Sequence, residues 1–472
     1  MLASSVMRRP AAAVWIAAAL VVCAQGALAF DRYVTYGYGA DLGLYTQTIL
    51  DAFHGAANQV EHGSHFLVHF SPIYFLIAPL LQLLRSPMTL EILQICACAL
   101  TAPAIYLLAR KRIAQPLAVL VALVVLFYPP LFSMALSEFH ENAFVPATIA
   151  WLVWAIDERR FGWAALLAAL ALCTKEDEAV ILALLGGAYL IVSMRRKDRA
   201  GAWFGASVAV ASLAVLALYF DYIQPHSGGR YFVADFYLAH NADLPHGIAI
   251  LSQRVTFLLE VFVPLLFLPF ASRWLWLAVP GLIEVLSSRW PVTYTMGDHY
   301  AAVWIPYVLV AFALGVARVA AGDARRARTL VAICLGLCIA DLIVASPTHW
   351  AHYYRLRTPR DAALDRIIAQ VPRDAFVASF DEAYTHMSLD PNARIGMYVT
   401  PDYFVYDPHY RGVTWSASIV PRLAAAVCPG FMVPVASQDG VTLYKRVKPV
   451  PDLAYARAQG DPPSCLPHAA HS

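Results

Sequence analysis

Long apolar segments recur along the first 346 residues and are separated by short polar turns. Most reach, or nearly reach, the roughly 20 residues that a helix needs to cross the roughly 30 Å apolar core of a bilayer. They lie at residues 11–30, 88–109, 115–132, 142–156, 161–174, 178–194, 202–220, 254–271, 274–288, 300–318 and 329–346. The pattern predicts an all-α polytopic membrane bundle, residues 1–346, with about eleven transmembrane helices, the shorter of which would have polar ends in the interface or inside the protein.

The segment between the first two of these spans, residues 31–87, is predicted to be an outer loop with helices on the membrane surface. Residues 41–53 have a helical pattern. Residues 65–84 mix aromatics, leucines and the prolines Pro72 and Pro79, so we expect a surface helix there and not another span.

The composition changes at about residue 347, where Asp, Arg, Pro and Tyr replace the Leu and Ala runs. We predict a small extracytoplasmic α/β domain at 347–447 and a loose tail at 448–472. Its expected elements are helices at 361–370 and 422–427, strands at 375–380 and 394–399, and a hairpin of 431–436 with 441–446 across a Ser-Gln-Asp-Gly turn.

Composition and charge agree with a membrane protein and set its orientation. The chain is 60% hydrophobic and only 14% charged, and its net charge of +2 gives no indication of nucleic-acid binding. With a cytoplasmic N-terminus, 16 Lys and Arg residues lie in inside segments and 6 in outside loops. The positive-inside rule therefore predicts an inner-membrane protein with a cytoplasmic N-terminus and a periplasmic C-terminal domain. Arg8-Arg9 and Ala27-Leu28-Ala29 also fit a cleavable signal peptide, but ten further spans favour an uncleaved first helix.

The eight cysteines form no sequence framework. Six lie in apolar spans and are expected to be small core residues. Cys428 and Cys465 both fall in the outer domain and tail, where an oxidising compartment could pair them.

Titratable side chains are concentrated on the predicted outer side, which holds all 15 histidines. The acidic residues at helix ends on this side are Asp41, Glu138, Glu141, Glu176, Asp177, Glu178 and Asp298. Ionisable groups near bilayer depth face a cavity or each other. A wet pocket that opens outward would explain them together.

Each polar motif has a functional and a structural interpretation. Asp41 could act as a general base on an acceptor hydroxyl, or it could cap the helix that follows it. His65 and His69 have the spacing of two metal ligands on one helix face, or they are interfacial histidines. Together with Asp298 and His299 they are the candidate ligands of a divalent metal ion.

Two outer turns supply the other candidates. Glu138 and His140 belong to the dense polar turn Ser137–Asn142, which lacks the second histidine of a zincin helix. Lys175 could hold a phosphate as a point charge, or it could simply pair with Glu176 or Asp177. Arg230 is another outside cation. The chain has no Walker loop, no GxSxG elbow and no cytoplasmic Asp-x-Asp, which argues against ATP-driven transport by this chain alone and against nucleotide-sugar chemistry on the inner face.

Four stretches resemble the bacterial membrane proteins of the domain-of-unknown-function family 2079. They are Tyr38-Gly-Ala-Asp-Leu-Gly-Leu-Tyr-Thr-Gln47, His69-Phe-Ser-Pro72, Glu138-Phe-His140 and Thr174-Lys-Glu-Asp177. That family is similar in plan to the GT-C glycosyltransferases, which transfer a sugar from a polyprenyl-phosphate carrier on the outer face. The resemblance implies that Asp41 takes the place of the catalytic acidic residue and that Lys175 lies near the carrier phosphate.

The first hypothesis is therefore an outer-face glycosyltransferase that takes a polyprenyl-phosphate-linked sugar within the lipid bilayer. Its expected substrate-binding residues are Gln47, Glu138, His140, Lys175, Glu176 and Arg230. The alternatives are a lipid-linked solute transporter or flippase, and a non-catalytic sensor or assembly protein. A transporter would need polar residues along the inner halves of the spans, where Leu, Ala and Val predominate, so the one-sided pattern favours an enzyme.

Overall fold

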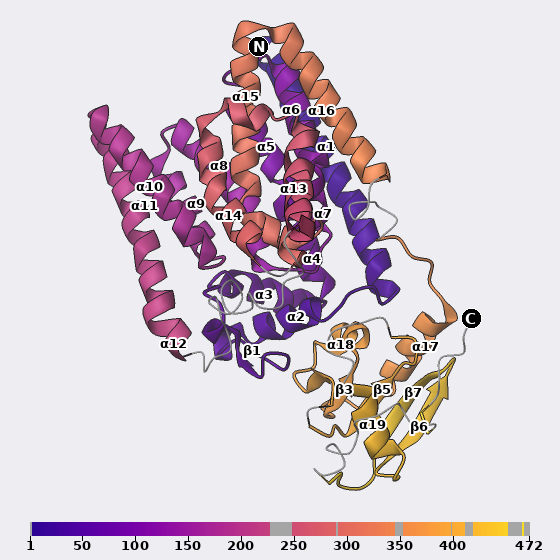
Figure 1. The fold of residues 1–472 in the computed structure, drawn as a ribbon. Helices are drawn as coiled ribbons and strands as arrows, with labels where there is room; N and C mark the ends of the chain where they lie inside the picture. The colour runs from indigo at the N-terminus through magenta and orange to yellow at the C-terminus, as the bar shows by residue number, and fades with distance from the viewer. Residues whose placement is uncertain are drawn as a thin grey trace. The chain divides into compact units, whose positions relative to one another are not determined.

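The computed structural model describes residues 2–226, 248–288, 291–344, 353–397, 399–410, 419–451 and 465–466. The chain forms two compact units (Figure 1). The helical unit consists of Met1–Ala27, Phe66–Tyr74 and Glu91–His352. The mixed unit consists of Leu28–His65, Phe75–Leu90 and Tyr353–Ser472.

Six helical segments among the described residues are long and apolar enough to cross a membrane. They are Pro10–Val34 of α1 (Leu2–Val34), α4 with α5 (Met88–Ala99 and Thr101–Ala109), α10 (Asp177–Arg195), α11 with its continuation to His226 (Arg199–Ala217), α15 (Ile305–Gly322) and α16 (Ala324–Val344). A seventh candidate is the pair α6 (Gln115–Phe127) and α7 (Pro129–Ala135), which bends by 51°. A multi-pass membrane bundle is therefore confirmed.

The predicted number of eleven helices is not confirmed. Helices do form in the four remaining apolar segments: α8 (Val145–Asp157), α9 (Phe161–Leu172), α13 (Ile248–Phe262) and α14 (Val279–Ser287). They have only 9 to 15 residues. At roughly 1.5 Å per residue, even the longest falls well short of the roughly 30 Å apolar core. After α13 the chain continues as short 3₁₀ turns, with Leu266 and Phe267 in the left-handed region.

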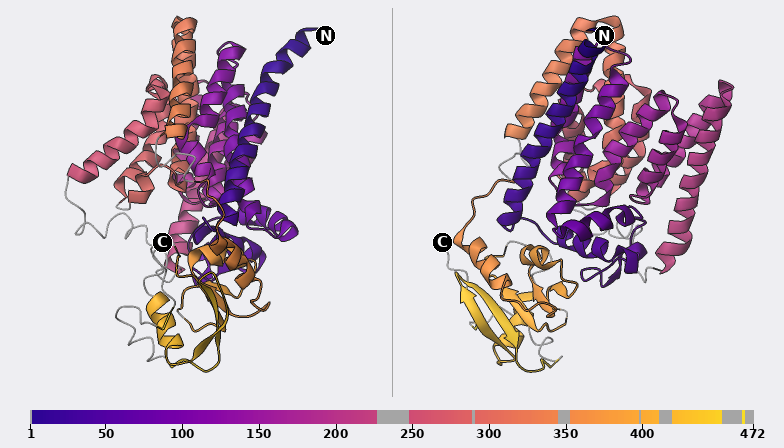
Figure 2. Two further views of the ribbon diagram at one scale, coloured as in Figure 1. Left: turned by 90° about the vertical axis from the view of Figure 1, so that its right-hand side faces the viewer. Right: turned by 180° about the vertical axis from the view of Figure 1, so that it is seen from behind.

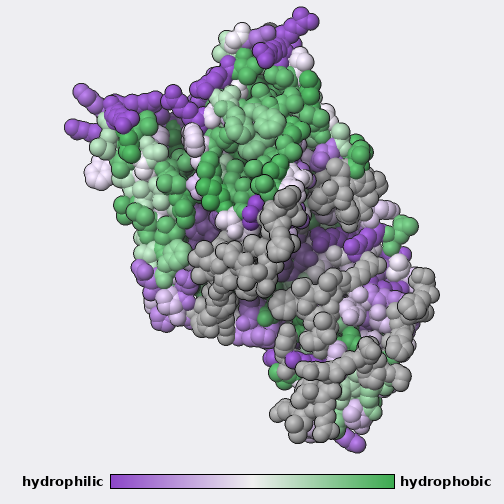
Figure 3. Space-filling view, viewed as in Figure 1, coloured by the Kyte–Doolittle hydropathy of each residue, from purple (hydrophilic) through white to green (hydrophobic). Residues whose placement is uncertain are grey.

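On the face seen in Figure 3, the helical unit has a broad apolar band between hydrophilic ends. Exposed apolar side chains such as Trp203 and Val210 lie along α11. Hydrophilic surface covers the α10–α11 and α15–α16 turns (Figure 3), where Arg195, Arg196 and Arg325 are exposed. Arginine-rich turns of this kind anchor helices at one membrane face.

Small residues let α10 and α11 pack closely, and the two helices run side by side in Figure 2. A Cβ on Gly186 would lie 2.6 Å from the backbone nitrogen of Ala209. A Cβ on Gly205 would likewise lie 2.6 Å from the backbone nitrogen of Leu190. Close backbone approach at small residues is how membrane helices gain van der Waals contact.

The mixed unit contains a five-stranded sheet of order β4-β3-β5-β7-β6. Its strands are β3 (Val377–Ser379), β4 (Ala393–Ile395), β5 (Tyr403–Tyr406), β6 (Met432–Gln438) and β7 (Val441–Arg446). β3 is parallel to β4 and β5, and β7 is antiparallel to β5 and β6. Three helices accompany it: α17 (Pro359–Ile368), α18 (Asp381–Met387) and α19 (Ile419–Val427). The predicted small C-terminal domain with a sheet is therefore present.

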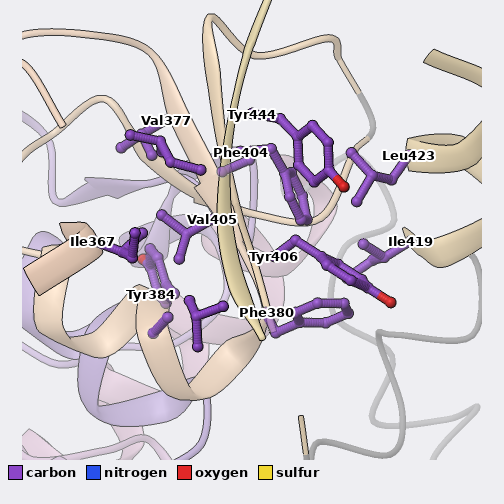
Figure 4. Close-up of a cluster of buried hydrophobic side chains, with 14 of the residues drawn as sticks. Ile367, Val377, Phe380, Tyr384, Phe404, Val405, Tyr406, Ile419, Leu423 and Tyr444 are labelled. Carbon is purple, nitrogen blue, oxygen red and sulfur yellow. The ribbon is translucent and has the colours of Figure 1, made fainter. Parts of the chain in front are cut away.

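The core of the mixed unit is an apolar cluster on this sheet (Figure 4). Phe404 and Val405 of β5, Tyr384 of α18 and Leu423 of α19 are among its buried members. Tyr36 and Ala40, which precede α2 (Asp41–Leu50), belong to the same cluster. Residues from the start of the chain thus complete the core of the C-terminal domain.

Glycine allows α2 to approach α18 very closely. A Cβ on Gly43 would lie 2.5 Å from the Tyr384 ring, so only glycine fits there. The Thr385 hydroxyl donates to the carbonyl of Gly39 at 2.7 Å. The contacts therefore group most of the predicted outer loop 31–87 with the C-terminal domain, which differs from the predicted assignment to the transmembrane domain.

Several elements of the mixed unit follow the sequence prediction. The hairpin β6–β7 forms, and Asp439 and Gly440 at its turn have φ values of 46° and 83°, as the two-residue hairpin turn requires. Cys428 and Cys465 form a disulfide with their Cα atoms 5.6 Å apart. Most of the predicted tail 448–472 lies outside the described residues.

The predicted helix 65–84 is wrong in extent. Only α3 (Tyr74–Leu84) and a single 3₁₀ turn, His65–Leu67, form there. Pro72 accounts for the interruption, because a proline disfavours helical backbone at the residue before it. β5 and α18 were not predicted.

The glycine packing of α10 gives a stability test with a matched control. Gly186→Ala should destabilise the helical unit by about 1–3 kcal/mol, because its methyl group would overlap the α11 backbone. Gly187→Ala should leave stability unchanged, since no atom lies within 4 Å of a Cβ there. Thermal unfolding of both variants in detergent would measure the difference. Equal melting temperatures for the two would contradict the packing.

Candidate functional site

The helical unit gathers its polar side chains from four loops into one region, which we call the polar cluster. The loops are 66–74, 137–144, 173–178 and 298–303. Loop 173–178 lies at the start of α10 and loop 298–303 precedes α15. The arginine-rich turns lie at the other ends of these two helices. The cluster is therefore at the opposite end of the bundle from the arginine anchors.

Glu176 holds two of these loops together. One carboxylate oxygen lies 2.7 Å from Nδ1 of His69, and the other accepts a hydrogen bond from the backbone N–H of Phe70 at 2.9 Å. The backbone N–H of Ile73 also donates to the carbonyl of Cys173 at 2.9 Å. The carboxylate fixes the orientation of the His69 ring and places its proton on Nδ1.

Side chains from α4 hold the loop around His140. The backbone N–H of Phe139 donates to Glu91 at 2.8 Å, and that of His140 donates to the Gln94 side-chain oxygen at 3.0 Å. The Tyr74 hydroxyl donates to Glu141 at 2.9 Å. Buried backbone donors need such partners where no water is present.

His140 and His299 stack face to face, with ring centroids 3.4 Å apart and planes at 15°. His140 donates from Nδ1 to the carbonyl of Glu138 at 2.9 Å. Burial, followed by the charge of His299, holds the pKa of His140 well below its usual value, and Lys175 and His69 act in the same direction. His140 is therefore neutral at pH 7 and lies within electrostatic range of three cationic or titratable groups.

Asp298 balances part of this charge. Its carboxylate lies 2.7 Å from Nδ1 of His299, as a charge contact without good hydrogen-bond alignment, and accepts from the His299 backbone N–H. Burial alone would raise the pKa of Asp298, but the charge and hydrogen bonds of His299 outweigh it and lower the pKa. The Asp298 carboxylate is therefore ionised at neutral pH.

Lys175 brings a fixed positive charge to the cluster. Its ammonium lies 3.3 Å from Asp177, and its side chain is only 12% exposed. This pairing agrees with the structural interpretation of Lys175, while the effect of its charge on His140 agrees with a site for an anion. The structure thus brings together His69, Glu138, His140, Lys175, Glu176, Asp298 and His299.

The remaining candidates lie elsewhere. Asp41 is in the mixed unit, half-buried, as the first residue of α2, where a carboxylate interacts favourably with the helix dipole. The helix is capped from Ala40, so Asp41 is not its N-cap residue. Arg230 lies outside the described residues.

Gln47 has a structural role that the sequence did not suggest. Its side-chain nitrogen donates to the carbonyls of Asp390 and Ala393, and its oxygen accepts from the Gln59 backbone and the Tyr384 hydroxyl. These four bonds use the full capacity of the amide. These contacts give Gln47 a structural role, and its binding of substrate stays a prediction.

The four predicted metal ligands do not form one site. His65 lies in the mixed unit, where its ring contacts Glu61 at 2.9 Å, whereas His69 is paired with Glu176. They do not share a helix face, since the 3₁₀ turn ends at Leu67. Within the described ranges, no group of three or more His, Cys, Asp or Glu side chains is arranged to hold a metal ion. A bound divalent cation therefore stays a prediction. The described residues do not provide a set of ligands to coordinate it.

Sequence analysis missed the residues that hold the cluster together, chiefly Glu91, Gln94 and Tyr74. A signal for Glu91 was available, because an acidic residue inside an apolar span marks a site by default. The partners of Gln94 and Tyr74 are more than forty residues away in sequence, so no local pattern could have identified them.

Comparison with known proteins agrees with this architecture. The profile of a family described as "Predicted membrane protein (DUF2079)" matches residues 35–399, which include all four motifs noted above. No curated protein matches the chain in sequence. The crystal structure of ArnT from Cupriavidus metallidurans bound to undecaprenyl phosphate is similar, with a TM-score of 0.55 at 12% identity over 90% of this chain and 97% of that chain. The same protein in the apo state gives 0.54 at 13% identity over the same shares. Identity this low shows the fold alone, and the predicted GT-C resemblance is confirmed at that level.

The stacked histidines make stability depend on pH. His140 has a native pKa far below the value of roughly 6.5 expected for the unfolded chain. Stability is therefore complete above about pH 6.5 and falls as the pH drops below it, because only the unfolded state takes up the proton. The slope contributed by one proton is at most about 1.4 kcal/mol per pH unit.

The His140→Asn variant should show a flatter decline in melting temperature between neutral and acidic pH than the wild-type protein. Asn retains a donor for the Glu138 carbonyl but cannot be protonated. His54→Asn, at an exposed histidine, should follow the wild-type curve. Parallel curves for all three proteins would rule out a neutral, buried His140.

Proposed function

We propose that this chain, which belongs to the DUF2079 family of predicted membrane proteins, is a membrane glycosyltransferase that takes a sugar from a polyprenyl-phosphate carrier. The observation that carries the proposal is the polar cluster. It combines Lys175 with three histidine side chains at one end of an otherwise apolar bundle. The fold is that of ArnT, whose structure has been solved with undecaprenyl phosphate bound.

The cluster has the charges that a lipid phosphate needs. A lysine at 12% exposure interacts with an anion more strongly than one in bulk water, because the local dielectric is low. His69 and His140 already use Nδ1–H within the protein, so either ring would donate to a phosphate oxygen from Nε2 only after taking up a second proton, which the charge of a bound phosphate favours. In this mechanism Lys175 would exchange Asp177 for the carrier phosphate, and Glu176 would act as a positioning residue that keeps the His69 ring in place.

The family resemblance makes Asp41, in the mixed unit, the candidate general base, and this role is proposed independently of the phosphate contact of Lys175. The Asp41 carboxylate would take the proton of an acceptor hydroxyl as that oxygen attacks the anomeric carbon of the sugar. The bond between the anomeric carbon and the phosphate oxygen breaks, and its electron pair leaves with the polyprenyl phosphate. An in-line displacement of this kind inverts the anomeric centre.

We place the reaction on the extracytoplasmic face of the inner membrane. The arginine-rich turns lie at the opposite end of the bundle from the polar cluster, as the positive-inside rule requires for that orientation. The Cys428–Cys465 disulfide of the mixed unit suits an oxidising compartment.

Lys175→Gln tests carrier binding. We expect an affinity for undecaprenyl phosphate about tenfold to a hundredfold lower, because a charge-assisted contact contributes about 1.5–3 kcal/mol. Lys197→Gln is the matched control, because Lys197 is exposed just beyond the other end of α10. Binding can be measured by native mass spectrometry of the detergent-solubilised protein. Equal affinity in both variants would remove Lys175 from the phosphate site.

Asp41→Asn tests the chemical step and separates an enzyme from a transporter. The variant should keep its melting temperature and its carrier binding but lose transfer of the carrier's sugar by about a hundredfold or more, the usual contribution of a general base. Asp374→Asn, at an exposed position of the same unit, should retain full transfer.

The measurement is release of undecaprenyl phosphate from a sugar-loaded carrier in proteoliposomes. If the Asp41→Asn variant released undecaprenyl phosphate as fast as the wild-type protein, Asp41 would be excluded as the general base. Movement of an intact, sugar-loaded carrier between leaflets without any release would favour the flippase.

A further inference from the structure

The mixed unit contains a second polar site, distinct from the polar cluster, at the end of α3. A cleft of about 660 Å³ is lined by the end of α2, the segment 57–59, the end of α3 and residues 388–391. Its polar side chains include Asp51, Gln59, Gln82, Arg85 and Ser388. All of these residues belong to the mixed unit, so the cleft is formed by that unit alone.

Part of the lining is committed to the fold, and part is available to a ligand. Gln59 donates from its side chain to the carbonyl of Pro391, and one oxygen of Asp51 accepts from the backbone of Ala57. In contrast, the exposed side chains of Gln82 and Arg85 form no hydrogen bond or ion pair with the part of the chain that the structure describes. The cleft therefore offers an amide, a guanidinium and the second oxygen of Asp51 to an incoming molecule.

α3 itself is apolar on two faces. Ile77, Ala78 and Leu81 are buried in the protein. Leu76 and Leu83, on the other face, are 64% and 78% exposed. With 11 residues it extends only about 16 Å, too short to span a bilayer but suited to lie in its interface with the second face in the lipid. Gln82 and Arg85 flank the exposed Leu83 and Leu84, so the cleft opens beside lipid-facing residues.

The backbone at Arg85 gives an independent reason to regard its side chain as functional. Arg85 follows the last residue of α3 and has φ of 44°, in the left-handed region. Its N–H closes the helix onto the carbonyl of Leu81 at 2.8 Å. Glycine is preferred at this position because a side chain there strains the backbone. An arginine at such a position motivates the hypothesis that its guanidinium has a function.

We propose that this cleft binds the head group of a bilayer lipid that carries both a phosphate and free hydroxyl groups. Arg85 would pair with the phosphate, and Gln82 and Asp51 would hydrogen-bond the hydroxyls. The acyl chains would stay beside Leu83 and Leu84. The site goes beyond the proposed transferase reaction and does not depend on it.

The strained backbone at Arg85 provides a variant that removes the ligand contact without harming the fold. Arg85→Gly should unfold at the same or a higher temperature than the wild-type protein, since glycine adopts this φ without strain. Arg373→Ala is the matched control, because Arg373 is an exposed arginine of the same unit that does not line the cleft.

The probe is phosphatidylglycerol, mixed as a minor component into phosphatidylcholine nanodiscs that contain the full chain. The lipid that stays bound after detergent extraction is quantified by mass spectrometry. The wild-type protein and Arg373→Ala should retain phosphatidylglycerol selectively. Arg85→Gly should retain about tenfold less, and Gln82→Leu should show a smaller loss.

Unchanged retention in Arg85→Gly, or an equal loss in Arg373→Ala, would overturn the proposal. A lipid head group and a free phosphate ester would make the same contacts in the cleft, and glycerol 3-phosphate distinguishes between them. If it binds in detergent while phosphatidylglycerol is not retained, the site takes a free phosphate ester and the lipid assignment is wrong. None of these measurements uses sugar transfer, so failure of the transferase proposal would leave them unaffected.

Discussion

Carboxylates that hold backbone N–H groups are the interaction on which the polar end of the helical unit depends. Glu176 accepts from the N–H of Phe70 while it orients His69, and Glu91 accepts from the N–H of Phe139. Irregular loops at the end of an apolar bundle leave donors that neither helices nor water can satisfy. An acidic side chain provides the strongest neutral-pH acceptor available. The loops that carry His69 and His140 can therefore be ordered only because these carboxylates are buried beside them.

The need to bond the loop N–H groups gives some acidic residues of the cluster a structural role instead of a chemical one. A carboxylate with both oxygens bonded, such as Glu176, has little capacity left for a substrate. Lys175 contacts the Asp177 carboxylate at 3.3 Å, and its charge acts on His140. The cluster thus combines a fixed positive charge at Lys175 with a carboxylate, Glu176, whose oxygens hold the fold.

The same distinction applies to the motif 38–47 in the mixed unit. Gly43 is required for close contact with Tyr384, the carbonyl of Gly39 accepts from Thr385, and the amide of Gln47 is saturated. Most of the motif therefore connects the start of the chain to the C-terminal sheet. Asp41, at the first turn of α2, stays the predicted general base. The exposed apolar face of α3 and the left-handed backbone at Arg85 are further features of this unit.

The sequence by itself determined that most of the chain lies in a lipid bilayer, where its helices form, and which local turns it makes. Runs of apolar residues fix where helices form in lipid, and the Asp439-Gly440 pair fixes a hairpin through its own backbone preferences. Polar residues at helix ends correctly indicated the cluster that contains His69, His140 and Lys175. These properties depend on residues close together in the chain.

The tertiary structure decided the rest, because it depends on pairs that are distant in sequence. His69 and Glu176 are 107 residues apart, and Gln47 and Tyr384 are 337 apart. No local pattern distinguishes a glutamate that binds substrate from one that holds a loop, since both are buried acids beside a histidine. Likewise β5 gains its place between β3 and β7 only once the sheet is assembled, and α9 and α13 stop short of a full span only in the folded protein.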